Sequence, residues 1–186
     1  MDRKARTSSG IKIKRVSSQL ELVQAFTIRI RVFVQEQRVP AEIELDSDDQ
    51  RAIHFLAIKS GKVAGTARVV LKHGNAKVGR MAVLKSYRHR GVGAALLKRA
   101  ILAAKRLHAR RIYLHAQLAV IGFYQRLGFR AVGRDFDEAG IAHRKMILGG
   151  ELTTKGHKVG AGRDRPLHGF GRLTAKNAKD AKKYDS

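Results

Sequence analysis

The segment Arg88-His89-Arg90-Gly91-Val92-Gly93 follows an apolar, β-branched run and leads into an alanine-rich helical pattern, so it marks a strand-to-helix junction. Glycine allows a positive φ and a close approach of the backbone to a ligand. The start of a helix presents unpaired N–H groups and the positive end of the helix dipole, which together form an anion site. The two arginines add charge-assisted hydrogen bonds to phosphate oxygens. The segment therefore predicts a pyrophosphate that is held mainly by backbone.

The spacing of the glycines narrows the choice of ligand. A dinucleotide-binding loop has the pattern G-x-G-x-x-G, but the third glycine position is Leu96 here. A P-loop needs Gly-Lys followed by Ser or Thr, and the chain has no such triplet. Arg88, Gly91 and Gly93 do fill the pattern Arg/Gln-x-x-Gly-x-Gly/Ala, which resembles the acetyl-coenzyme A loop of the GNAT-type N-acetyltransferases. The alternative is a glycine turn flanked by solvated arginines.

Three further segments resemble the same family, in matching order over roughly residues 12–148. The run 118–129 contains Phe123-Tyr124 and ends in Gly-Phe, as a short helix of the family does. Residues 31–40, with Glu44-Leu45-Asp46 and Asp49 after them, are similar to the ElaA/YjcF-like subgroup of predicted acyltransferases. Residues 136–143 resemble that subgroup's Glu-Ala-Gly-Ile-Pro-His segment, with Ala142 in place of the proline.

The resemblance implies an α/β (α+β) GNAT fold: a mixed, mostly antiparallel central sheet with splayed strands four and five and helices on both faces. The residue patterns agree with this order of elements. Ser18-Gln19-Leu20-Glu21 is a capping box that starts the first helix. The expected strands are 11–16, 52–59, 62–71, 78–84, 113–116, 129–134 and 142–148, and the expected helices are 19–33, 93–109 and 120–127.

Composition predicts three parts: a flexible basic N-terminus (1–10), one GNAT domain (11–149) and a disordered basic tail (150–186) whose few large apolar residues cannot offset the entropy of ordering. The chain has 186 residues and no cysteine, which excludes disulfides and a thiol nucleophile. The first residues have no apolar core of a secretory signal, and no apolar run approaches a membrane span. We therefore expect a cytoplasmic protein that does not bind membranes.

The net charge of +24 favours an anionic partner, and the coenzyme is one. Nucleic acid, bound through the basic tail, is a less favoured partner. The densest acidic cluster lies between Glu36 and Asp49, where Glu36, Glu42 and Glu44 are predicted to attract a cationic amine acceptor. The alternative is that these acidic residues form only solvated surface.

The resemblance implies that coenzyme A contacts the fourth strand, the loop and two later positions. These residues are Met81, Ala82, Val83, Arg88, His89, Arg90, Gly91, Val92, Gly93, Ala94, Gln117 and Phe123. Tyr124 resembles the family tyrosine that lies beside the coenzyme sulfur, where its hydroxyl can donate a proton. Its alternative role is packing. Backbone N–H groups near Met81 and Val83 could hold the thioester carbonyl oxygen.

The general base is not fixed by the sequence, because the fourth strand lacks the glutamate that many family members carry there. Candidates are Glu36, Glu44, His115, Glu138 and His143, of which His115, Glu138 and His143 are the predicted catalytic residues besides Tyr124. A structural role for His115 is an equal alternative. We find no convincing metal-ligand pattern, so no metal is predicted.

The sequence thus predicts an acetyl-coenzyme A-dependent N-acetyltransferase that works by direct attack of an amine in a ternary complex. The alternative is a non-catalytic GNAT-shaped module that binds coenzyme A or nucleic acid. Either a monomer or a homodimer is compatible with the sequence. The acceptor is expected to be a small-molecule amine, whose identity is set by variable loops and stays open.

Overall fold

The computed structural model describes residues 10–149. The predicted flexible N-terminus, up to residue 9, and the predicted tail from residue 150 lie outside the described residues. The strands are β1 (Ile11–Arg15), β2 (Ile53–Lys59), β3 (Lys62–Lys72), β4 (Asn75–Val83), β5 (Arg111–Gln117), β6 (Phe129–Glu138) and β7 (Ile141–Leu148). The helices are α1 (Gln19–Arg29), α2 (Ala41–Glu44), α3 (Val92–Arg106) and α4 (Ile121–Gln125). A π-helical segment, η1 (Ile30–Glu36), continues α1, and 3₁₀ turns cover Ser47–Gln50, Lys85–Tyr87 and Leu118–Val120.

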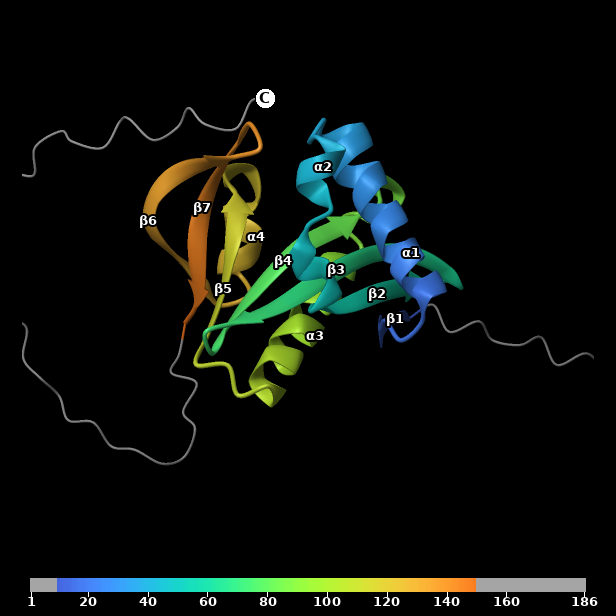
Figure 1. The fold of residues 1–186 in the computed structure, drawn as a ribbon, viewed down its shortest axis with the longest axis horizontal. Helices are drawn as coiled ribbons and strands as arrows, with labels where there is room; N and C mark the ends of the chain where they lie inside the picture. The colour runs from blue at the N-terminus through green and yellow to red at the C-terminus, as the bar shows by residue number, and fades with distance from the viewer. Residues whose placement is uncertain (1–9, 150–186) are drawn as a thin grey trace, which may run out of the picture. The chain divides into compact units, whose positions relative to one another are not determined.

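The strands form one mixed sheet of seven strands in the order β1-β2-β3-β4-β5-β7-β6 (Figure 1). Neighbouring strands are antiparallel except β4 and β5, which are parallel. This parallel pair is joined by α3, the long connection that parallel strands require. The predicted mixed, mostly antiparallel sheet is confirmed.

The pair β4 and β5 is hydrogen-bonded only at its beginning. The paired residues run from Asn75 with Arg111 to Lys77 with Tyr113, although both strands continue well beyond this point. Past Lys77 and Tyr113 the two strands diverge, and one edge of each is left without a strand partner (Figure 1). The predicted splay of strands four and five is therefore confirmed.

Helices cover both faces of the sheet. The main core lies on the α3 face, where Leu96, Leu97 and Ala100 pack at helical spacing against buried residues of the central strands, such as Phe55 and Ile112. The opposite face is covered by α1 and η1, with a small apolar cluster of Ile28, Val32 and Ala82. Four charged side chains are also buried in the protein, Arg29, Glu44, Asp49 and Arg68.

Two local predictions need correction. The strand predicted over 78–84 begins earlier, at Asn75, which pairs with Lys72 because His73 and Gly74, both with positive φ, make the turn. The predicted capping box is only half formed. The Ser18 hydroxyl accepts from the Glu21 N–H, whereas the Glu21 carboxylate accepts from the Ser17 N–H at 2.8 Å rather than from Ser18.

A buried network of ion pairs joins α1 to the sheet. The Arg29 side chain is fully buried and donates to Glu44 at 2.5 Å and to Asp49 at 2.6 Å. Arg68 on β3 donates to Asp49 and to Asp46, both at 2.7 Å. Burial alone raises the pKa of Asp49, but the hydrogen bonds from Arg29 and Arg68 outweigh it and lower this pKa to about 2.

Removing one member of such a network leaves buried charges without partners. We expect Arg29→Ala to lower the free energy of unfolding by about 3–5 kcal/mol, and Arg31→Ala, at an exposed position two residues on, to change it by less than about 0.5 kcal/mol. Urea unfolding at neutral pH measures both variants. Equal stability of the two would show that Arg29 does not hold α1 on the sheet.

Candidate active site

The loop between β4 and α3 has the backbone of an anion site. Gly91 adopts a left-handed conformation with φ 80° and precedes the first residue of α3. The first helical hydrogen bond runs from the Ala95 N–H to the Gly91 carbonyl at 3.0 Å, so the N–H groups of Val92, Gly93 and Ala94 have no acceptor within the helix. Three N–H groups at the positive end of a helix fit a phosphate.

The two glycines of this loop serve different purposes. A Cβ on Gly91 would lie 3.6 Å from Ile11 Cδ1, an ordinary contact, so a side chain there is opposed by the positive φ and not by crowding in the protein. A Cβ on Gly93 would lie 3.4 Å from the ring of Phe123, which brings α4 close to the start of α3. The free N–H groups at the start of α3 therefore lie beside the ring of Phe123.

Arg88 folds back over the open edge of β4. Its Nε donates to the Val83 carbonyl at 3.0 Å, and its two terminal nitrogens donate to the Glu36 carboxylate at 2.6 and 2.7 Å. The hydrogen bonds from Arg88 lower the pKa of Glu36. Two residues that were predicted for different ligands, Arg88 for the coenzyme and Glu36 for the acceptor, are thus bound to each other.

The segment after α1 bridges the two splayed strands at their far ends. Glu36 reaches Arg88, which follows β4, and the next residue, Gln37, accepts a hydrogen bond of 2.8 Å from Gln117 at the end of β5. Both contacts join two side chains. The Arg88 side chain is 33% exposed and the Glu36 side chain is 40% exposed. An exposed pair of this kind contributes only about 0–1 kcal/mol, so it can be exchanged for a ligand.

The open edge of β4 offers backbone groups to the gap between the strands. The Leu84 N–H donates to the Ala64 carbonyl, toward β3. Successive residues of a strand direct their backbone groups to opposite edges, so the Val83 N–H and carbonyl lie on the β5 side. The bond from Arg88 to the Val83 carbonyl agrees with this direction.

Tyr124 lies on α4 and contacts β4. Its hydroxyl approaches Met81 Sδ at 3.9 Å, and its ring packs edge-on against Phe123. Burial raises the pKa of Tyr124 to about 12. The hydroxyl is therefore protonated at neutral pH and available as a donor close to Met81, one of the predicted coenzyme contacts.

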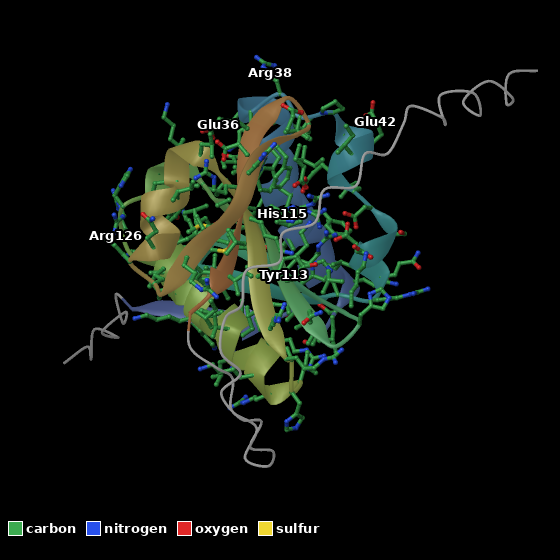
Figure 2. All side chains as sticks on the ribbon, turned by 90° about the vertical axis from the view of Figure 1, so that its left-hand side faces the viewer. Glu36, Arg38, Glu42, Tyr113, His115 and Arg126 are labelled. Carbon is green, nitrogen blue, oxygen red and sulfur yellow. The ribbon has the colours of Figure 1, made fainter. Side chains whose placement is uncertain are left out.

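His115 and Glu138 form a pair on the other arm of the gap. His115 Nδ1 lies 2.9 Å from Glu138 Oε2, and this hydrogen bond is the main reason that the pKa of Glu138 falls to about 2. An ionised carboxylate only accepts, so the proton lies on Nδ1, and in the neutral imidazole Nε2 keeps its lone pair. Figure 2 shows His115 and Tyr113 in a row on β5, with Glu36 beyond them.

His143 lies on the same surface of the sheet. Its Nδ1 donates to the Ile141 carbonyl at 2.7 Å, and its ring stacks on Phe136, which also contacts His115 edge-on at 4.8 Å between ring centroids. The hairpin of β6 and β7 thus brings together His115, Glu138 and His143, three predicted catalytic residues. Nothing in this arrangement by itself assigns a role to His143.

The three predicted acceptor glutamates are not brought together. Glu36 is paired with Arg88, and Glu42 is exposed on α2 (Figure 2). Glu44 is only 3% exposed and is ion-paired with Arg29 and Arg80. Burial raises the pKa of Glu44, against the pull of these two arginines.

Three residues near the gap were not singled out from the sequence. Arg80 has φ 49° at a bulge in β4 opposite Ala67, and it donates to the Ile43 and Glu44 carbonyls. Burial lowers the pKa of Lys77, which lies where β4 and β5 part and is near enough to Glu138 to be partly compensated by it. Gln37 is the third. A lysine and an arginine inside an otherwise small and apolar strand are the signal that could have found the first two.

Within residues 10–149, no group of three or more His, Asp or Glu side chains is arranged to hold a metal ion. Over the same residues, no helix combines the length and the apolar character that crossing a membrane requires.

Comparisons with known proteins agree with this geometry. The family model of the acetyltransferase (GNAT) domain matches residues 14–149. The chain is 38% identical over 128 residues to the uncharacterized N-acetyltransferase YjcF of Bacillus subtilis, a match that covers 68% of this chain and 91% of YjcF. An acyl-CoA N-acyltransferase from Pseudomonas aeruginosa superposes with a TM-score of 0.67 at 30% identity, over 76% of this chain and 100% of that one. Escherichia coli ElaA gives a TM-score of 0.66 at 25% identity, over 74% and 99%.

The loop geometry predicts how coenzyme A binding responds to substitution. Gly91→Val forces a β-branched side chain into a left-handed conformation, so we expect the loop to rearrange and coenzyme A binding, measured by calorimetry, to be lost. Gly133→Val is the matched control, because Gly133 also has a positive φ (74°) and free space around its Cβ but lies on β6. Normal coenzyme affinity in Gly91→Val would contradict the assignment of this loop.

Proposed function

Because the chain belongs to the GNAT acetyltransferase family, we propose that it transfers an acetyl group from acetyl-coenzyme A to a primary amine by direct attack in a ternary complex. Acyl transfer from an acyl-coenzyme A is the chemistry of the family, and the acetyl donor, the amine acceptor and the direct route are our inference. One observation carries it. The open edge of β4 is flanked on the α3 face by the glycine loop and a protonated tyrosine, and the histidine–carboxylate pair lies across the gap on β5 and β6.

The residues present fit the coenzyme. The N–H groups at the start of α3 would hold its pyrophosphate, with charge from Arg90 and from Arg88 once Arg88 leaves Glu36. The Val83 N–H, on the open edge, is a donor for a carbonyl oxygen and acts where negative charge develops. When bound, acetyl-coenzyme A supplies a thioester carbonyl to be attacked and a thiolate to leave.

Tyr124 is proposed as the proton donor to the leaving sulfur. Its burial keeps the proton on the hydroxyl, and its place beside Met81 puts that proton at the β4 edge. A phenol with a pKa of about 12 is a weak acid. A hydrogen bond from its hydroxyl still stabilises the negative charge that develops on the leaving sulfur.

His115 is proposed as the general base for the amine. Glu138 holds Nδ1 protonated, so Nε2 is free to take a proton from an ammonium or amine, directly or through water. The carboxylate also stabilises the imidazolium that results. No cysteine is present in the chain, so a cysteinyl acyl-enzyme has no place in the reaction.

The acceptor is proposed to be a small amine that enters from the side of η1 and α2. Among the three glutamates predicted for this role, Glu42 is the one that is exposed and free of an ion pair, whereas Glu44 is held by two arginines. Binding of the coenzyme to Arg88 would release the Glu36 carboxylate at the same end of the gap. Glu36 and Glu42 are therefore our candidates for attracting the ammonium group.

The role of Tyr124 can be measured with a panel of primary amines, by following free thiol release from acetyl-coenzyme A. We expect Tyr124→Phe to lower kcat by roughly 10²–10⁴-fold with little change in coenzyme affinity, because the ring still packs and only the proton donor is lost. Tyr113→Phe, on β5, is the matched control and should keep kcat. If no amine of the panel causes the wild type to release thiol, or if kcat is unchanged in Tyr124→Phe, the result would favour a module that binds coenzyme A without turnover.

The base is tested by substituting each member of the pair. The carboxylate of Glu138, with its pKa lowered to about 2, stays ionised from pH 5 to 9, so it accepts from Nδ1 of His115 throughout that range. We expect His115→Gln to lower kcat by roughly 10²–10⁴-fold with little change in coenzyme affinity, because the proton acceptor is lost. Glu138→Gln should lower kcat less, because the imidazole is still present but is no longer held by a carboxylate. An unchanged kcat in His115→Gln would exclude His115 as the base.

A further inference from the structure

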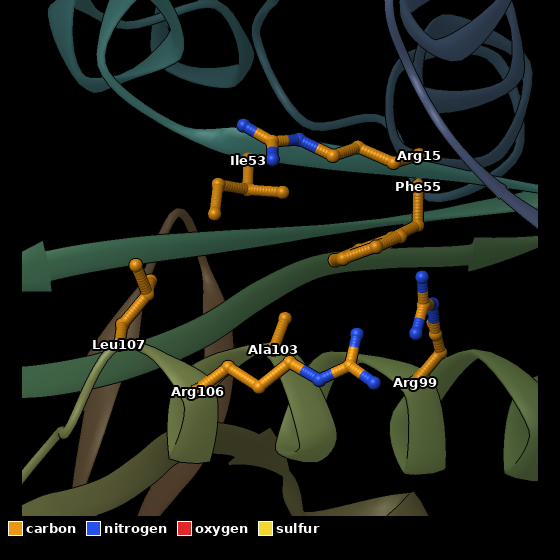
Figure 3. A pocket seen from close by; sticks show the side chains of 7 residues that line it. All are labelled: Arg15, Ile53, Phe55, Arg99, Ala103, Arg106 and Leu107. Atoms are coloured by element: carbon orange, nitrogen blue, oxygen red, sulfur yellow. The ribbon is translucent and has the colours of Figure 1, made fainter.

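A small hollow lies between the edge strand β1, its neighbour β2 and the C-terminal half of α3. It has a volume of about 120 Å³ and is lined by Arg15, Ile53, Phe55, Arg99, Ala103, Arg106 and Leu107 (Figure 3). None of these residues belongs to the loop or to the gap between β4 and β5. An apolar floor and three guanidinium groups distinguish this hollow from ordinary surface.

The three arginines come from two elements and lie around the same space. Arg15 ends β1, whereas Arg99 and Arg106 lie two turns apart on one face of α3. Figure 3 shows the Arg15 side chain above the hollow and the guanidinium groups of Arg99 and Arg106 along its α3 side. Like charges held around one small space repel each other, and an anion between them would relieve that repulsion.

These three arginines, like several others among residues 10–149, have no carboxylate partner, and they are set apart because they line one hollow. Arg29, Arg68, Arg80, Arg88 and Arg144 each form an ion pair with an Asp or Glu. Within residues 10–149, no such pair is formed by Arg15, Arg99 or Arg106, and the hollow is lined by no acidic residue. Guanidinium groups suit planar, two-pronged contacts to carboxylate or phosphate.

Part of the lining of the hollow is apolar and favours an apolar group on the ligand. The Arg99 guanidinium lies 5.8 Å from the centre of the Phe55 ring, a cation–π contact that orients it. Ile53, Ala103 and Leu107 complete the apolar lining. A cavity of about 150 Å³ accommodates benzene in another protein, so a hollow of this size has room for one ring and not for a nucleotide.

We propose that this hollow binds a small organic anion in which a single carboxylate or phosphate group is attached to one apolar ring. The oxyanion contacts Arg99 and Arg106 with Arg15 opposite, and the ring lies on Phe55 and Ala103. The site is separate from the coenzyme loop, because Arg99 lies about 10 Å and Arg106 about 20 Å along the helix axis from Val92. The proposal does not depend on the acetyl-transfer function.

The test uses benzoate and phenyl phosphate as probes, with calorimetry on the full-length protein at fixed ionic strength in the presence of saturating coenzyme A. We expect both probes to bind, and neutral benzyl alcohol and inorganic phosphate to bind at least tenfold more weakly. Arg99→Gln and Arg106→Gln should each weaken the binding of benzoate by tenfold or more. Arg130→Gln, at an exposed position on β6, is the charge-matched control and should leave it unchanged.

A second variant keeps all three charges and fills the hollow. Methionine is a good helix former, and Ala103→Met adds a flexible apolar side chain to the lining, so it should abolish benzoate binding with little change in melting temperature. Benzoate affinity that is unaffected by Ala103→Met, or equally reduced by Arg130→Gln, would overturn the proposal. Benzoate binding that is seen only when coenzyme A is left out would overturn it too, because the probe would then occupy the coenzyme loop.

Discussion

The end of pairing between β4 and β5 after Lys77 and Tyr113 is the constraint on which the candidate active site depends. Two parallel strands that stayed paired would satisfy each other's backbone groups and leave no donor for a carbonyl oxygen. Because the strands part, the backbone groups of Val83 face a gap, and the side chains of β5 line its other wall. Backbone groups at an open edge lack hydrogen-bond partners from a neighbouring strand. The Arg88 side chain supplies one such partner by donating to the Val83 carbonyl.

The splay is held open by structures on either side of it. On the α3 face, α4 packs against the strand ends, with Phe123 against Gly93 and Tyr124 against Met81. On the other face, the bulge at Arg80 in β4 moves Met81 to the core side and lets the arginine reach the carbonyls of α2. The buried pairs of Arg29 with Glu44 and Asp49 then fix α2 and the following turn to α1. Ion pairs between buried charges thus hold this face together, and such pairing is needed because buried charges without partners are strongly destabilising.

Local sequence patterns predicted the features that depend on neighbouring residues in the chain, such as turns, strand alternation and helix starts. The hairpin of β2 and β3 and the start of α3 at the glycine loop follow from alternation, turn residues and helix periodicity, and they are where the sequence placed them. The splay itself was expected only from the family resemblance, since nothing in the residues of β4 or β5 states where their pairing ends. Strand boundaries were less accurate, as Asn75 shows, because both His73 and Asn75 are residues that turns accept.

Contacts between distant segments could not be predicted in this way. The acidic run from Glu36 to Asp49 looks uniform in sequence, yet Glu36 meets Arg88, Glu44 and Asp49 are buried beneath α1, and Glu42 is exposed. Which carboxylate meets which arginine depends on the tertiary arrangement, in which residues 15 to 52 positions apart become neighbours. The same holds for the pair of His115 and Glu138, which the β6–β7 hairpin brings within 2.9 Å.

The distribution of partners among the arginines gives the net charge of +24 a structural meaning. Where a guanidinium meets a carboxylate, as Arg29, Arg68 and Arg80 do, it stabilises the fold and is unavailable to a ligand. Arg88 is intermediate, because its partner Glu36 is exposed and such a pair contributes little to stability. Arg15, Arg99 and Arg106 form no ion pair within residues 10–149, and they line a common hollow. In a chain this basic, an unpaired arginine alone says little about binding, whereas unpaired arginines from two elements around a common space with an apolar floor define a site by geometry.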